Sequence, residues 1–149
     1  MITDKENIFG FLGQSFQKSL IKLVLEDKKF GDNIVDVMDH HYFDSASFKH
    51  IFSLIQEFHD DFKTIPAYDT LVQLIKTNAV SDQAASITMH IETLDKIKEH
   101  KIEDAEHIKK QALNFCKQQN LKNAIKEVEI IMKNGKFEQY QEIENIIQK

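Results

Sequence analysis

The stretch from Leu20 to Leu74 decides the fold, and it reads LIKLVLEDKKFGDNIVDVMDHHYFDSASFKHIFSLIQEFHDDFKTIPAYDTLVQL. Its apolar residues recur every three or four positions, which is the spacing of one helix face. We predict a first helix from Ser15 and a second, short helix from Phe30 to Met38, separated by the charged run that begins at Asp27. The residues from Asp39 to Asp44 then form an elbow before the next helix.

The longest apolar stripe begins after Ser45. A serine at this place accepts hydrogen bonds from the first free N–H groups of a helix, and the apolar residues that follow repeat at i, i+3, i+4 and i+7. This pattern predicts the central core helix of the fold. Its inward residues are Phe48, Ile51, Phe52, Ile55, Phe58 and Phe62.

Pro66 restarts the chain after the Phe-rich helix. Proline disfavours a helical conformation at Ile65 but is tolerated in a first helical turn, so we predict the next helix from about Pro66 to Lys76. Ser81 is a suitable N-cap for one more helix. The inward residues of these two helices are Leu71, Leu74, Ile75, Ala84, Ile87, Ile91 and Leu94.

The last third of the chain predicts a helical hairpin. Residues 104–134 contain neither proline nor glycine, which indicates an unusually long helix for a globular domain. The apolar stripe of this helix changes face near Gln119, after Ile108, Ala112 and Phe115. Asn134-Gly135 is a stop signal, and a second amphipathic segment from Phe137 to Ile147 completes an αα-hairpin. Such a hairpin has little core of its own and needs a partner to cover its apolar side.

The composition agrees with an all-α fold. A chain of 149 residues with 42% hydrophobic residues and eleven Phe can bury a core and suits one small domain with an appendage. Four Gly and one Pro leave few turns. We therefore expect an N-terminal tail over residues 1–13, a small globular helical bundle over residues 14–102 and a protruding αα-hairpin over residues 103–149.

The charge distribution argues against DNA binding by this chain alone. All nineteen basic residues are Lys, and residues 1–100 hold 10 Lys against 16 acidic residues. An acidic body without the planar guanidinium of Arg is a poor ligand for phosphates. A single cysteine, Cys116, excludes an internal disulfide and fits a reducing compartment. No signal peptide and no apolar run near the roughly 20 residues of a membrane span is present, so we expect a cytoplasmic protein with no membrane partner.

The sequence offers little catalytic chemistry. The glycines are scattered, and none forms a phosphate-binding loop. His40 and His41 with Asp39 and Asp44, and His59 with Asp60 and Asp61, are the candidates for a metal cluster. The His-Asp pairs resemble HD-type metal phosphohydrolases, which need further ligands from other helices, with His41, Asp95 or Asp104 as the nominees. The spacings are too short for that family, so we predict no catalytic, cofactor-binding or metal-binding residue.

The order of the elements carries a resemblance to a known family. The segment MDHHYFDSASFKHIFSLIQEF, from Met38 to Phe58, with the Ile-Pro restart, resembles the N-terminal domain of DnaB-like replicative DNA helicases, and especially those of T-even-type phages. The similarity covers about residues 16–148, is strongest over 20–76, and rests mostly on layout over 104–148. A small polar cap often follows this proline in the family, whereas Ala67 stands here.

The resemblance implies a non-catalytic domain that organises a helicase ring as a collar and docks primase or a helicase loader. ATP and Mg²⁺ would belong to a motor domain outside this chain, DNA would be bound only by the full-length ring, and the compartment would be the bacterial host cytoplasm if a phage encodes the protein. Hairpins pair between subunits in that family, so we predict self-association through Leu121, Ile125, Val128, Met132, Tyr140, Ile143 and Ile147.

Two alternatives belong to other functional classes. A stand-alone helicase loader, inhibitor or primase-side adaptor with the same bundle would have the same sequence pattern. An HD-like metal phosphohydrolase would require bound metal and phosphodiesterase activity.

Overall fold

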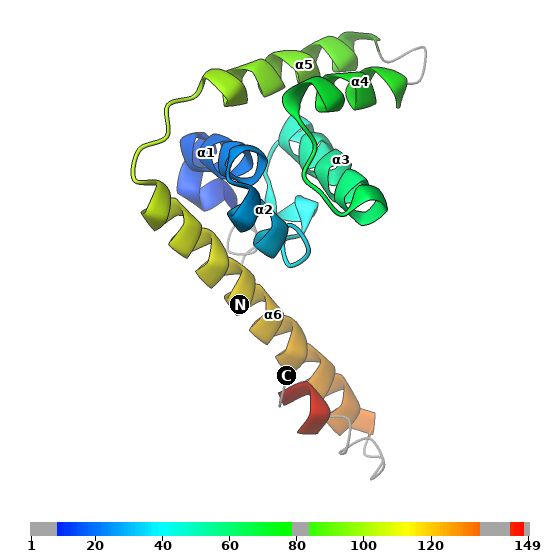
Figure 1. Ribbon diagram of the computed structural model, residues 1–149. Helices are drawn as coiled ribbons and strands as arrows, with labels where there is room; N and C mark the ends of the chain where they lie inside the picture. Colours follow the sequence, from blue (N-terminus) through cyan, green and yellow to red (C-terminus); the bar gives the residue numbers. More distant parts are fainter. Residues whose placement is uncertain (1–8, 79–83, 135–143, 148–149) are drawn as a thin grey trace. The chain divides into compact units, whose positions relative to one another are not determined.

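A computed structural model of the chain describes residues 9–78, 84–134 and 144–147 (Figure 1). Every regular element in these ranges is helical and none is a strand, so the predicted all-α class is confirmed. The chain divides into two compact units, residues 1–112 and residues 113–149. None of the described helices is long and apolar enough to cross a membrane.

Two consecutive helices lie near the start of the first unit, and both were expected near these positions. Helix α1 spans Gly13–Glu26, and the short helix α2 spans Lys28–Ile34. The prediction that the second helix reaches Met38 is wrong, because the helix ends at Ile34 and a turn follows. Met38 is nevertheless buried, whereas Val37 is half-exposed.

The elbow contains a 3₁₀ turn, η3, at His40–Tyr42, and the core helix α3 follows at Ala46–Phe62. Ser45 caps α3 as predicted, because its hydroxyl accepts a hydrogen bond from the N–H of Phe48 at 3.0 Å. Four of the predicted inward residues, Phe48, Ile51, Phe52 and Ile55, are buried.

Phe62 departs from the predicted stripe. Its side chain is 64% exposed, although its spacing places it in the apolar series of α3. Phe62 is the last residue of the helix, and Lys63 beyond it adopts a left-handed conformation that ends the helix. The ring of Phe62 lies against that of Phe58, with 4.6 Å between the ring centroids.

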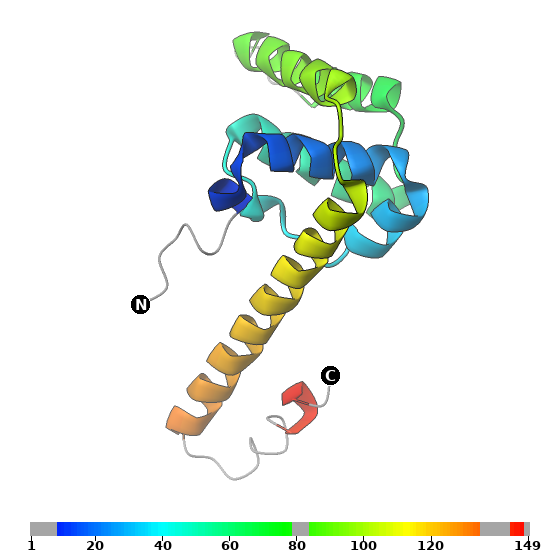
Figure 2. The ribbon, with the colours of Figure 1, turned by 90° about the vertical axis from the view of Figure 1, so that its left-hand side faces the viewer.

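Helices α4 (Tyr68–Thr77) and α5 (Ala84–Glu99) complete the bundle of the first unit. They lie side by side, and each also contacts α3 (Figures 1 and 2). Helix α4 begins two residues after Pro66, with Ala67 at the N-cap and no side-chain cap bond. Leu71 and Ile75 are buried as predicted, and so is Leu94. The predicted cap at Ser81 lies outside the described residues.

The last residues of the segment that we expected to be an N-terminal tail are regular and partly buried. Residues Phe9–Leu12 form a 3₁₀ helix, η2, that contacts α1. The Phe9 side chain is fully buried, with its ring centroid 5.6 Å from that of Phe16 and 5.2 Å from that of Phe43. Aromatic side chains bury more apolar area than most others, so burial of Phe9 holds the segment against the bundle.

Helix α6 spans Ala105–Asn134 without interruption, which confirms the predicted long helix. Its buried residues are Ile108, Ala112, Phe115, Cys116 and Gln119. After Gln119 every described side chain of the helix is exposed or half-exposed. Residues 144–147 are helical, and the rest of the predicted second helix of the hairpin, with the stop at Gly135, lies outside the described residues.

Asp27 caps α2 and forms an ion pair with Lys109 at the start of α6. Its replacement therefore separates the contributions of the cap and of the ion pair to stability. Its carboxylate accepts hydrogen bonds from the N–H of Phe30 at 3.2 Å and from Lys109 Nζ at 2.5 Å. Asparagine keeps the cap but loses the ion pair, whereas alanine loses both. In urea unfolding at neutral pH we expect stability to fall in the order wild type, Asp27→Asn, Asp27→Ala.

The same ion pair has a pH signature. The hydrogen bond from Lys109, together with that from Phe30, lowers the pKa of Asp27. A carboxyl whose pKa is lower in the folded state stabilises the fold above its unfolded pKa of about 4, and this stabilisation is lost as the pH falls. The stability difference between wild type and Asp27→Asn should therefore shrink below about pH 4. A difference that grows in acid would contradict the assignment.

Candidate functional site

The second unit carries an exposed apolar stripe along α6. Leu121 is 63% exposed, Ile125 49% and Met132 58%, while Val128 on the same face is half-buried. Leu121, Ile125 and Val128 line a groove of about 670 Å³ together with Ile146 and Ile147. Tyr140 and Ile143, the other two predicted contact residues, lie outside the described residues. Exposed contiguous apolar surface of this kind marks sites of association.

The stripe has the spacing of a coiled-coil seam. Leu121, Ile125, Val128 and Met132 are separated by four, three and four residues, which is the a/d repeat of paired helices. Lys122 and Glu129 each follow a seam residue and flank one side of the stripe. Ala124 and Ile131 each precede a seam residue and flank the other side. The seam is therefore wide and apolar, with one charged edge.

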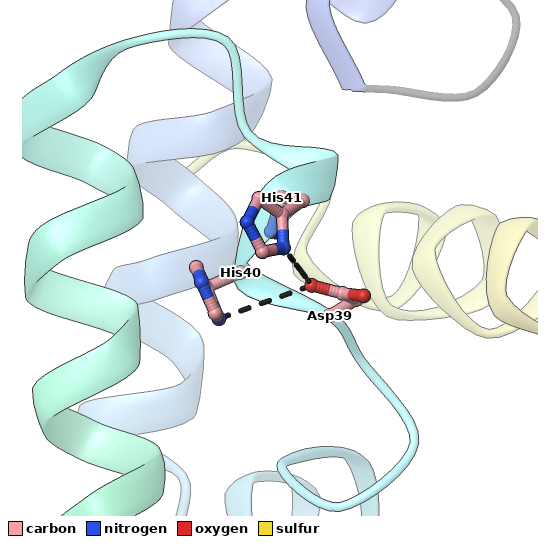
Figure 3. Close-up of side chains that lie close together, drawn as sticks. All are labelled: Asp39, His40 and His41. Atoms are coloured by element: carbon pink, nitrogen blue, oxygen red, sulfur yellow. Dashed lines mark hydrogen bonds and ion pairs between the residues drawn. The ribbon is translucent and has the colours of Figure 1, made fainter.

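The elbow brings Asp39, His40 and His41 together, as Figure 3 shows. Asp39 Oδ1 accepts a hydrogen bond from the N–H of His41 and lies 2.9 Å from Nδ1 of the same residue and 3.8 Å from His40 Nδ1. Partial burial opposes ionisation of Asp39, but the two hydrogen bonds from His41 and the charges of His41 and His40 together lower the pKa of the carboxyl. This arrangement is that of a capped 3₁₀ turn. Asp44, the fourth predicted member, does not belong to the cluster.

The second candidate metal cluster, at His59 and Asp60, contains a different third residue from the one expected. His59 and Asp60 lie close to Asp36, which is in the turn after α2, rather than to Asp61. Neither Asp95 nor Asp104 belongs to a metal-compatible group among the described residues. The described residues therefore do not bring the HD-type ligand set together. They do bring together a different group, Asp36, His59 and Asp60.

Sequence reasoning missed a histidine pair between α3 and α5. The rings of His50 and His90 stack with 4.5 Å between their centroids, and Ser47 Oγ lies 2.9 Å from His90 Nδ1. The pair borders a cavity of about 300 Å³ that Ile75 and Met89 also line. Residues so far apart in the sequence give no local signal, so only the packing of α5 on α3 reveals this contact.

Two partly buried histidines, His90 and His100, predict a loss of stability in mild acid. Burial, with the neighbouring His50, lowers the pKa of His90, and burial, with the charges of Lys18 and Lys22, lowers the pKa of His100. The unfolded chain then binds protons more readily than the folded one below about pH 6.5, so stability falls as the pH drops. We expect a lower unfolding midpoint at pH 5.5 than at pH 7.5, and a smaller change in His90→Gln. If the unfolding midpoint of His90→Gln changed as much as that of wild type, or more, His90 would not be a source of the acid sensitivity.

Cys116 offers no reactive thiol. Its side chain is buried, and burial raises its pKa to about 11. The thiolate is the nucleophilic form, so the native protein keeps this residue in its unreactive state at neutral pH.

A comparison with protein-family models, curated proteins and solved structures finds no match for this chain.

Proposed function

We propose that this chain is a non-catalytic helical domain that self-associates through α6 of its second unit, as the N-terminal domain of a phage-type DnaB-like helicase would. The exposed apolar stripe at Leu121, Ile125 and Met132 carries the proposal. Association lowers the free energy when a second helix removes large apolar side chains at coiled-coil spacing from water. In the helicase role, the paired domains form a collar that docks primase or a loader.

The charges that flank the seam favour an antiparallel pairing of two α6 helices. If Leu121 faces Met132 of the second copy, Ile125 faces Val128, and Lys122 of each copy then lies beside Glu129 of the other. A parallel pairing would instead place Lys117 beside Lys122 of the second copy, which is a contact between like charges. Residues that flank a coiled-coil seam set helix orientation in this way.

Charge reversal tests the orientation. Lys122→Glu or Glu129→Lys alone would create two like-charge contacts per pair of copies, and we expect each to weaken self-association by about tenfold. The double variant restores both ion pairs and should associate like wild type. Analytical ultracentrifugation at low salt measures the three dissociation constants. Additive weakening in the double variant would reject the antiparallel pairing while leaving self-association itself intact.

The sequence of the full gene distinguishes the helicase-domain proposal from the stand-alone adaptor. The proposal expects the reading frame to continue beyond Lys149 into an ATP-binding motor domain with a phosphate-binding loop. A stop codon at that place would overturn the helicase-domain proposal and leave the loader or adaptor as the function of the same association surface.

A further inference from the structure

His59 lies in the last turn of α3 among carboxylates from the end of α2. The residue is only 9% exposed, which is unusual for a histidine in a turn of polar residues. Its Nε2 atom lies 3.3 Å from Asp32 Oδ1, and its Nδ1 atom lies 3.6 Å from Asp36 Oδ1. Ligand atoms of Asp36, His59 and Asp60 all lie within 4.8 Å of one another.

The two distances at the imidazole have different meanings. A separation of 3.6 Å between Nδ1 and Asp36 is too long for a hydrogen bond. It is close to the distance between two ligands of one tetrahedral ion, roughly 3.4 Å for bonds of about 2.1 Å. The Asp32 carboxylate lies beside the other ring nitrogen, Nε2. In metal-binding histidines, the nitrogen that does not bind the metal commonly donates to a carboxylate, which fixes the orientation of the ring.

The neighbouring backbone holds Asp36 in place before any ion binds. Gln56, one turn before His59 on α3, donates from its side-chain amide to the carbonyl of Val35 at 3.1 Å and to that of Met38 at 2.5 Å. These bonds fix both sides of the turn that carries Asp36. Asp36 and Asp60 are themselves exposed, so rotation of their side chains can close the remaining distances.

We propose that Asp36, His59 and Asp60 bind a divalent transition-metal ion of the zinc class, with Asp32 orienting the imidazole. One neutral imidazole and two carboxylates suit Zn²⁺ better than Mg²⁺, which prefers oxygen ligands alone. A fourth position remains for water or for a group from a partner. The ion would join the end of α2 to the end of α3.

The elbow provides a matched control. Asp39, His40 and His41 have a similar composition, but they are consecutive residues of a single turn and His41 is exposed. Asp39 is also engaged by the N–H of His41. A site that depended only on local acidic and histidine content would respond equally to changes in either group.

The test is titration of the full chain with Zn²⁺ in competition with a chromogenic chelator, with Mg²⁺ as the comparison ion. We expect one Zn²⁺ per chain, at least about tenfold weaker binding in Asp36→Asn and in Asp60→Asn, and similar weakening in Asp32→Asn. Asp39→Asn should bind like wild type. All four substitutions are at exposed carboxylates, and circular dichroism checks that each variant folds.

A second readout does not depend on any variant. Zn²⁺ should shift the imidazole ¹⁵N resonances of His59 in the wild-type protein, with Nδ1 as the bound nitrogen. Absence of Zn²⁺ binding by the wild type, unchanged binding in both Asp36→Asn and Asp60→Asn, or loss of binding only in Asp39→Asn would each overturn the proposal. An ¹⁵N shift confined to the other histidines would do the same.

Discussion

Replacing Gly31 with alanine should destabilise the first unit by about 1–3 kcal/mol. Gly31 is buried in α2, where a Cβ atom would lie 2.3 Å from the carbonyl oxygen of Val24 in α1 and 3.2 Å from Cγ1 of Ile65. The nearest neighbour is backbone, so it can yield only if α1 and α2 move apart. Helix propensity alone would predict the opposite sign, because alanine favours a helix by about 1 kcal/mol over glycine.

Asn33→Ala is the matched control, since Asn33 is exposed on the same helix. Its free energy of unfolding should stay within about 0.5 kcal/mol of wild type. Urea unfolding of the two variants compares them directly. A Gly31→Ala protein that is as stable as wild type, or more stable, would show that α1 and α2 do not approach each other this closely.

The second large effect concerns the seam of α6. Ile125→Asp places a carboxylate in the middle of the apolar stripe, where pairing would bury it without a partner. We expect the dissociation constant for self-association to rise at least about 100-fold, which corresponds to roughly 2.7 kcal/mol. The circular dichroism spectrum should keep its helical shape, because Ile125 is half-exposed within its own unit.

Ile130→Asp controls for the chemistry of the substitution. Ile130 is also exposed, at 61%, but its position in the helical repeat places it away from the stripe of Leu121, Ile125, Val128 and Met132. This variant should associate like wild type. Equal effects of the two substitutions in size-exclusion chromatography with light scattering would mean that the stripe has no special role.

Much of the secondary structure follows from local signals in the sequence. The hydroxyl of Ser45 begins α3 because it satisfies a free N–H of the first turn. Pro66 keeps the preceding residue out of the helical region. Thirty-one residues without Pro or Gly produce one uninterrupted helix, α6. Each of these effects acts within a few residues, so the sequence alone is sufficient to predict it.

The features that sequence could not predict arise from tertiary packing. Phe9 is buried because rings from α1 and the elbow surround it, and Phe62 is exposed because it ends its helix. The contact of Gly31 with Val24 depends on how closely two helices approach. Likewise, Asp36 joins His59, and His50 stacks on His90, only after the helices pack.

Sedimentation equilibrium of the unmodified chain over a wide concentration range tests the association surface most directly. Burial of the α6 stripe by a second copy predicts an average mass that rises with concentration to at least twice that of one chain. A mass that stays at one chain up to submillimolar concentration would contradict the proposal that another copy covers this surface.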